Sequence, residues 1–148
     1  MRLTSYTDFT LRTLIYLGLN GNERATIREI SECYGISRNH LMKIVQDLSH
    51  QGLISTIRGK SGGMYLLRDP SEINVGALVR RPEADFRLVE CFEAGPNGCR
   101  LTGGCVLTSA LRDALEAFFE VLDGYTLADL LRPQRNLRRL LGMNSAIS

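Results

Sequence analysis

Two short amphipathic helices joined by a tight turn constrain the fold of this chain more than any other feature. Thr26 and Glu29 have the spacing of a capping box, in which the hydroxyl accepts from a backbone amide and the carboxylate accepts from the cap amide. The helix that begins there ends at Gly35, and Ser37 is placed to cap the next helix. Helices joined by Gly-Ile-Ser in this way are typical of a helix-turn-helix.

The outward face of the second of these helices is polar and begins with Arg38, Asn39 and His40, followed by Lys43. In a helix-turn-helix the first residues of this helix meet base edges in the major groove, where Arg suits guanine and Asn suits adenine. The face therefore indicates contact with double-stranded DNA. A solvated helix surface would be equally polar, so the next segment of the chain is needed to decide.

A glycine-rich hairpin is predicted over residues 52–67, with Arg58 and Lys60 at its tip. Beside a helix-turn-helix, a basic hairpin is typical of a wing that reaches phosphates or the minor groove, whereas a plain surface hairpin is the alternative. We expect a wing. The predicted DNA contacts are Arg28, Ser37, Arg38, Asn39, His40, Lys43, Arg58 and Lys60.

Charge and composition agree with this interpretation without establishing it. Residues 1–68 carry nine Lys or Arg against five Asp or Glu, whereas residues 69–148 carry nine against eleven. A basic half suits a nucleic-acid partner, although ordinary surfaces reach the same balance. No apolar run is long enough to span a membrane and the N-terminus lacks signal-peptide character, so we expect a cytoplasmic protein with reduced cysteines and no membrane partner.

A long and broadly apolar helix is predicted from residue 106 onward. Its charges form only a narrow strip, so it has more apolar surface than one small domain needs to bury. We expect a homodimer with its seam along residues 106–122, including Leu115 and Phe118, whereas burial within a single chain is the alternative.

The fold class is therefore mainly α with a small β wing, in which a winged helix-turn-helix domain is followed by a long dimerisation helix. Residues 1–82 form the expected DNA-binding domain and residues 83–105 form a cysteine loop. Residues 106–131 form the dimerisation helix with the segment after it, and residues 132–148 form a C-terminal tail.

Three of the four cysteines, Cys91, Cys99 and Cys105, have C-x7-C-x5-C spacing in a loop that also holds glycines and a proline. Thiolates are the soft ligands that iron–sulphur clusters and zinc prefer. A structural zinc site usually has four Cys or His ligands in close pairs, and this loop has neither a C-x2-C pair nor a His. A cluster with one ligand from elsewhere fits better, and chance grouping of thiols is the remaining alternative. Cys33, on the apolar face of its helix, is interpreted as a core residue.

Four segments of the chain resemble one family of regulators. These are MRLTSYTDFTLRTLIYL, YGISRNHLMKIVQDL, IRGKSGG and LDGYTLADLL, and the similarity extends from residue 1 to about residue 131. They are similar to the iron–sulphur-cluster winged-helix transcription regulators, the family that includes NsrR, IscR and RirA. The resemblance implies a homodimer crossed by the long helix and bound to a palindromic operator. It also implies a 4Fe-4S or 2Fe-2S cluster in each cysteine loop, near the partner's DNA-binding domain.

The same resemblance bears on the signal that is sensed. Asp8 stands where NsrR-like members carry an aspartate that reaches the partner's cluster, which implies a repressor that senses nitric oxide and releases DNA when its cluster is nitrosylated or lost. Thr108 stands where IscR-like members carry a histidine, which weakens that relationship. The loop itself looks more like the iron-responsive RirA type, so iron sensing is the alternative. Asp8 could equally be an N-terminal helix residue favoured by the helix dipole.

Two other classes of function are disfavoured by the sequence. An electron-transfer protein would need a cluster but no DNA-reading half. An enzyme is not expected, because no nucleophile–base arrangement is visible and the glycine-rich segment 59–63 lacks the ordered Gly-Lys-Ser/Thr ending of a phosphate-binding loop.

Overall fold

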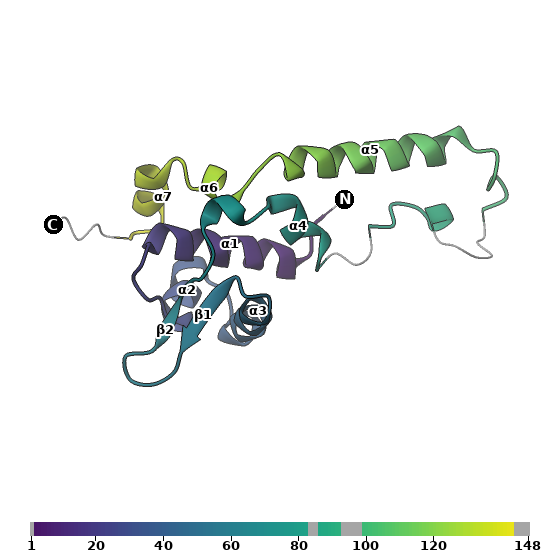
Figure 1. The fold of residues 1–148 in the computed structure, drawn as a ribbon. Coiled ribbons are helices and arrows are strands. Elements are labelled where there is room, and N and C mark those ends of the chain that lie inside the picture. The colour runs from purple at the N-terminus through teal and green to yellow at the C-terminus, as the bar shows by residue number, and fades with distance from the viewer. Residues whose placement is uncertain (1, 83–85, 93–98, 144–148) are drawn as a thin grey trace.

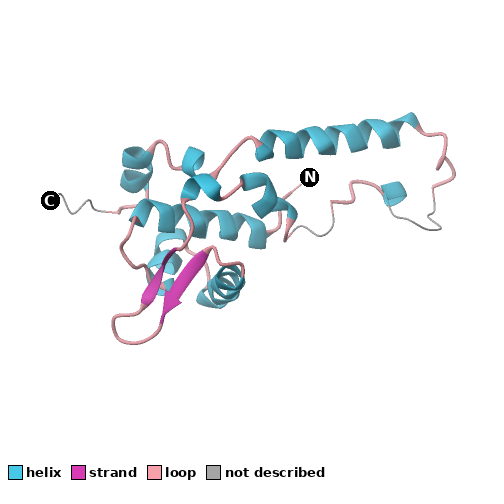
Figure 2. Ribbon diagram, in the orientation of Figure 1, coloured by secondary structure: helices cyan, strands magenta, loops and turns pink. Residues whose placement is uncertain are grey.

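The protein is a mainly helical chain with one small antiparallel sheet, as the sequence predicts (Figures 1 and 2). The computed structural model describes residues 2–82, 86–92 and 99–143. Its α-helices are α1 (Ser5–Asn20), α2 (Ile27–Tyr34), α3 (Arg38–His50), α4 (Val75–Arg80), α5 (Val106–Asp123), α6 (Leu127–Leu130) and α7 (Gln134–Leu140). The strands are β1 (Ile54–Ile57) and β2 (Gly63–Leu66), and two short 3-10 helices are η1 (Pro70–Glu72) and η2 (Glu90–Phe92).

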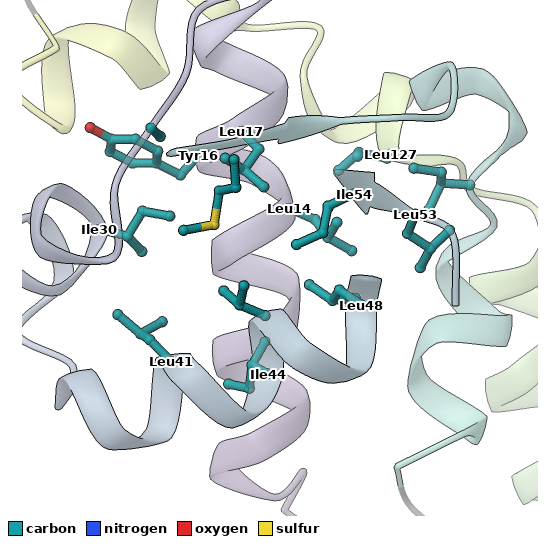
Figure 3. Close-up of a cluster of buried hydrophobic side chains, with 14 of the residues drawn as sticks. Leu14, Tyr16, Leu17, Ile30, Leu41, Ile44, Leu48, Leu53, Ile54 and Leu127 are labelled. Carbon is teal, nitrogen blue, oxygen red and sulfur yellow. The ribbon is translucent and has the colours of Figure 1, made fainter. Parts of the chain in front are cut away.

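A hydrophobic core centred on α1 holds residues 2–82 together, and this part of the molecule is called the N-terminal body below. Leu14 of α1 packs among side chains of α2, α3 and β1, including Ile30, Leu41 and Ile54 (Figure 3). All four are 1% exposed or less, so each contributes the free energy of a fully buried aliphatic side chain, about 1.5–3 kcal/mol. This core fixes α3 against α1.

The caps predicted for the helix-turn-helix are present. Thr26 accepts from the amide of Glu29, and the Glu29 carboxylate accepts from the amide of Thr26, which completes the capping box. Gly35 has the left-handed backbone that ends α2, with φ of 66°. The Ser37 side chain then accepts from the amide of His40 at 3.3 Å and starts α3.

The wing is a two-stranded antiparallel hairpin with Ile54 opposite Leu66. Ala25, before α2, adds a short bridge to Met64, so the hairpin is tied to the helix-turn-helix by two backbone hydrogen bonds of 2.8 and 2.9 Å. A side chain at Gly62 would collide with the carbonyl oxygen of Ile57. The predicted wing is therefore confirmed as part of the body, and within the described residues the strands lie only there (Figure 2).

Helix α5 forms an arm that projects from the body, together with η2 and residues 99–105 (Figure 1). In the described part of the chain, Phe119 is the single buried residue of α5, and it packs with Val75 and Val79 of α4. Leu115 and Phe118, which are expected at a dimer seam, are partly buried against this same cluster of their own chain. The sequence could not show this because it does not tell which side of α5 faces α4.

The α4–α5 junction, made by Asn74, Gly76, Arg80 and Asp123, fixes the C-terminal end of the arm to the body. Arg80 donates two hydrogen bonds of 2.6 Å to the Asp123 carboxylate and lies 4.3 Å from the Phe119 ring centroid. Asn74 donates to the backbone oxygen of Asp123 at 2.8 Å. A side chain at Gly76 would collide with the Asp123 carboxylate, so the close approach requires glycine there.

Helix α7 lies within residues 132–148, a segment expected to be a tail. Arg138 donates to the backbone oxygen of Leu19 at 2.6 Å, and the Cys33 thiol lies 3.5 Å from the backbone oxygen of Leu141. Burial raises the pKa of Cys33, as expected for a thiol packed at a helix contact. The sequence does not predict α7, because the residues that hold this helix in place, Leu19 and Cys33, lie more than a hundred residues earlier in the chain.

Candidate DNA interface and cysteine-lined pocket

The exposed face of α3 carries the side chains predicted to read bases. Arg38, Asn39, His40 and Lys43 are all exposed, at one end of the helix, while the opposite face is in the core. The His40 ring lies 6.0 Å from the ring of Phe9 in α1, which limits its range of orientations. This arrangement leaves Arg38 and Asn39 able to donate to base edges.

Two of the predicted DNA contacts have structural roles in the chain itself. The Ser37 hydroxyl accepts from the His40 amide as the cap of α3, although its second lone pair and its proton are still available. Arg28, on α2, donates to Glu32 at 2.8 Å, and this hydrogen bond raises the pKa of the guanidinium. Arg28 is therefore paired on its own helix rather than joined to the cations of α3.

The wing tip presents Arg58 and Lys60 to solvent. Sequence reasoning missed Arg24, which donates to the backbone oxygen of Ser61 at 2.8 Å and holds the tip against the turn between α1 and α2. A side chain at Gly63 would press on the Cβ of Arg24, so the two segments are in close contact. The hairpin that carries the two tip cations is therefore anchored to the segment before α2, through Arg24 near the tip and through Ala25 at β2.

The three clustered cysteines line one pocket of about 690 Å³ at the outer end of the arm. Cys91 comes from η2, Cys99 from the following loop, and Cys105 from the cap position of α5. The other lining residues are Arg87, Leu88, Val89, Glu90, Leu101, Leu107, Thr108 and Leu111. The structure therefore brings together three thiols from separate segments within a largely apolar wall.

The start of α5 favours thiolate chemistry in this pocket. The backbone amides of Thr108 and Leu107, together with the Thr108 hydroxyl, lower the pKa of Cys105. The same hydroxyl lies 3.2 Å from the sulfur of Cys91, so Thr108 lies between two of the three cysteines. The family resemblance gives Thr108 no role beyond marking an absent histidine, and the spacing of the cysteines does not predict its hydrogen bonds.

The spacing of the cysteines tests which metal group they could hold. In residues 2–82, 86–92 and 99–143, no three Cys, His, Asp or Glu side chains lie close enough to share one metal ion. A structural zinc ion needs its ligands converged within about 2.3 Å of one point, whereas in an iron–sulphur cluster each thiolate binds a different iron. Three thiols around a pocket therefore fit a cluster better than a zinc ion.

Asp8 does not belong to the described lining of this pocket. It lies on α1 and forms an ion pair of 2.9 Å with Arg12, one turn later, in which both side chains are almost half exposed. Cys33 is also outside the lining and packs near α7. Within one chain, then, the cysteines meet one another but do not meet Asp8.

Comparison with known proteins identifies the family. The sequence matches the Rrf2 family, described as an iron-dependent transcriptional regulator, over residues 3–133. This chain belongs to the Rrf2 family. Its members are transcriptional regulators, and the predicted resemblance to winged-helix regulators is confirmed. None of the Rrf2 chain's described helices is long and apolar enough to cross a membrane.

The relatives of this Rrf2 protein include transcriptional regulators named NsrR. It is 51% identical to the HTH-type transcriptional regulator NsrR of Geobacillus kaustophilus, over 95% of this chain and 97% of that protein. It is 47% identical to NsrR of Oceanobacillus iheyensis, over 97% and 98% of the two chains. Among solved structures, T. potens IscR is similar with a TM-score of 0.69 and 25% identity, over 90% and 88% of the two chains.

Proposed function

We propose that this Rrf2 regulator is a homodimeric repressor that holds an iron–sulphur cluster in the cysteine-lined pocket and releases operator DNA in response to nitric oxide. The single observation that carries the proposal is the convergence of Cys91, Cys99 and Cys105 on one pocket at the start of α5. The similarity to proteins named NsrR supports the choice among members of the family.

The cysteine thiolates would bind three irons of a 4Fe-4S cluster, with 2Fe-2S as the other type that a cysteine-rich pocket accepts. When bound, such a group supplies iron atoms with which nitric oxide can react. The chain's own contribution would be to lower the pKa of Cys105, which favours its thiolate, and to position Cys91 through Thr108. Partly buried apolar side chains of the wall, including Leu88 and Leu111, would limit water at the sulfurs.

We propose the partner subunit's Asp8 as the ligand of the fourth iron. Asp8 lies apart from the pocket of its own chain, and its carboxylate is almost half exposed, so a second subunit could reach it. In this chain Asp8 is paired with Arg12, and exposed ion pairs of this kind contribute little to stability. Exchange of Arg12 for iron would therefore cost little.

On α5, a stripe of exposed apolar residues, separate from the side chains that pack against α4, supports dimerisation of two chains. Every member of this stripe is apolar and exposed, and the spacing alternates between three and four residues, as in a coiled-coil seam. The stripe consists of Leu107, Ala110, Ala114, Ala117 and Val121. Leu107 and Val121 are each 62% exposed, so a single chain leaves much of these two apolar side chains in water. Alanines at the centre would let a second α5 approach closely.

DNA recognition is proposed to follow the division of labour between α3 and the wing. Arg38 and Asn39 would contact base edges, and Arg58 and Lys60 would contact phosphates or the minor groove. The two α3 helices of a dimer would meet successive half-sites of a palindrome. Arg28, Ser37, His40 and Lys43 complete the proposed interface.

Iron sensing is the second candidate function, because the family description names iron and the loop has RirA-like spacing. The test is anaerobic purification, followed by absorption spectra and operator binding after nitric oxide or after an iron chelator. Release of DNA by nitric oxide with little effect of the chelator over the same period supports nitric-oxide sensing. Release by the chelator alone, with retention in nitric oxide, would support iron sensing instead.

A further inference from the structure

A second pocket, of about 570 Å³, is lined by residues of α1, α3 and α4 and by residues next to them. Three elements supply its wall: the first turns of α1, the second half of α3, and the end of α4. Its lining residues are Thr4, Tyr6, Thr10, Lys43, Asp47, His50, Gln51, Leu78, Arg81 and Pro82. Apart from Lys43, none of them belongs to the predicted DNA interface.

The charged groups of this pocket favour an anion. Lys43 and Arg81 carry positive charges and His50 adds a ring N–H donor, against one carboxylate among the described lining residues, Asp47. That carboxylate already accepts a hydrogen bond from the Tyr6 hydroxyl. Burial, and then the contact with Asp47, raise the pKa of Tyr6 to about 12, so Tyr6 stays protonated and keeps Asp47 paired.

The α1 wall of the pocket adds polar groups that also suit an anion. Thr4 is the cap of α1, a helix of 16 residues whose first amides and dipole favour negative charge at this end. Thr10 is only 5% exposed, and its hydroxyl has no hydrogen-bond partner in the described residues. A buried hydroxyl without a partner is costly, so a polar occupant or its bound water would relieve that cost.

The pocket borders the face of α3 that is proposed to read DNA. Lys43 and His50 are seven residues apart and exposed, so they lie on the same side of α3 as Asn39. When the first turn of α3 enters the major groove, the backbone of a DNA strand runs beside this flank. We propose that the α1–α3–α4 pocket binds a phosphate group of the operator backbone. This inference rests on the proposed DNA-binding function and extends its footprint to Arg81 and His50.

The test uses Arg81→Gln in the cluster-loaded dimer, with Arg135→Gln as the matched control. Both arginines are exposed, and Arg135 lies on α7, away from α3. Operator and non-specific affinities are measured as a function of salt. Loss of one phosphate contact should lower the slope of log affinity against log salt by about 0.9 per subunit, equally for both duplexes. The control should keep the wild-type slope.

A backbone scan identifies the source of the phosphate. Single methylphosphonates, which remove one charge, should weaken wild-type binding at one flanking position of each half-site and have little further effect on Arg81→Gln. Inorganic phosphate at constant ionic strength, followed by NMR of His50, is the other arm. Saturable phosphate binding together with a silent methylphosphonate scan would overturn the DNA assignment in favour of a free phosphate-bearing ligand.

The inference and the function it rests on fail in different ways. If Arg81→Gln and His50→Gln both keep the wild-type slope while Asn39→Ala loses operator selectivity, the phosphate site is wrong and the DNA interface stands. If Asn39→Ala and Lys60→Ala also leave binding unchanged, the proposed interface itself is wrong.

Discussion

The N-terminal body and the arm differ in how much of their apolar surface they bury. In the body, side chains of α1, α2, α3 and β1 bury one another almost completely. In α5, by contrast, Leu107 and Val121 are each 62% exposed, and Phe119 is the single buried residue in the helix. With Leu127 of α6 completing its core, the body can therefore fold from contacts within one chain, whereas the arm needs further partners. This difference separates the part that is proposed to read DNA from the part that is proposed to change with a signal.

Replacing one cluster ligand should have the largest effect, and it should be confined to the arm. Cys99→Ala removes one of three thiolates, so we expect complete loss of the cluster's absorption and of cluster-dependent operator binding. The helical content of the variant, measured by circular dichroism, should be close to that of the wild type because the body stays folded. Cys33→Ala is the control, because Cys33 is outside the pocket and its variant should keep the cluster. A cluster retained in Cys99→Ala would contradict the assignment.

A charge in the exposed stripe of α5 should separate the subunits. Ala114→Glu would place an unpaired carboxylate in the seam, at a cost of several kcal/mol, so sedimentation should show monomers that bind operator poorly. Ser109→Glu places the same charge outside the stripe on the same helix and should remain dimeric. If both variants stay dimeric, the seam lies elsewhere. Phe118 is unsuitable for this test because it packs within its own chain.

Core truncation should distinguish the two regions in the free energy of unfolding. Leu41 is fully buried in the body, so Leu41→Ala should cost about 2–5 kcal/mol. Leu107→Ala should change the unfolding of the body by much less and should act on dimer dissociation. Urea denaturation at several protein concentrations measures both quantities. Equal losses at the two positions would contradict the comparison.

Within the DNA interface, two substitutions should differ in kind. Asn39→Ala should relax base preference at a cost of about 1–3 kcal/mol for each lost contact. Lys60→Ala should instead weaken binding to all sequences and flatten its salt dependence. Binding isotherms on operator and shuffled duplexes separate the two patterns. Identical behaviour of both variants would remove the distinction between base and phosphate contacts.

The smallest effect is expected for Asp8→Ala. A carboxylate is a harder and weaker iron ligand than a thiolate, so the variant should still take up a cluster but lose it faster. The coupling between cluster and operator, typically about 1–3 kcal/mol, should decrease. Arg12→Gln is a useful companion, because it frees Asp8 without removing it. Wild-type spectra, nitric-oxide response and operator affinity in Asp8→Ala would exclude the cross-subunit ligand.

Features set by nearby residues could be predicted from the sequence, and those set by distant contacts could not. The caps at Thr26 and Ser37 form as expected because each depends on a hydrogen bond three residues along the chain. The orientation of α5 depends on Phe86 and α4, and this orientation decides that Leu115 faces inward.

The same reason limits what could be predicted at the sites. The spacing of Cys91, Cys99 and Cys105 identified them as one group, and the structure places them on one pocket. The part played by Thr108 depends on how α5 begins, and that of Arg24 depends on how the wing folds back. Such contacts join segments that no local pattern connects.

The α4–α5 junction makes α5 a lever with its pivot at Asp123. Over its 18 residues the helix is about 27 Å long, so a movement of about 2 Å at Cys105 corresponds to a rotation of only about 4° at the pivot. A loose pivot would absorb so small an angle. The paired hydrogen bonds from Arg80 and the absence of space beside Gly76 make this pivot stiff. A displacement at the sulfur end is therefore delivered to α4, and through Leu78 to the core on which α3 rests.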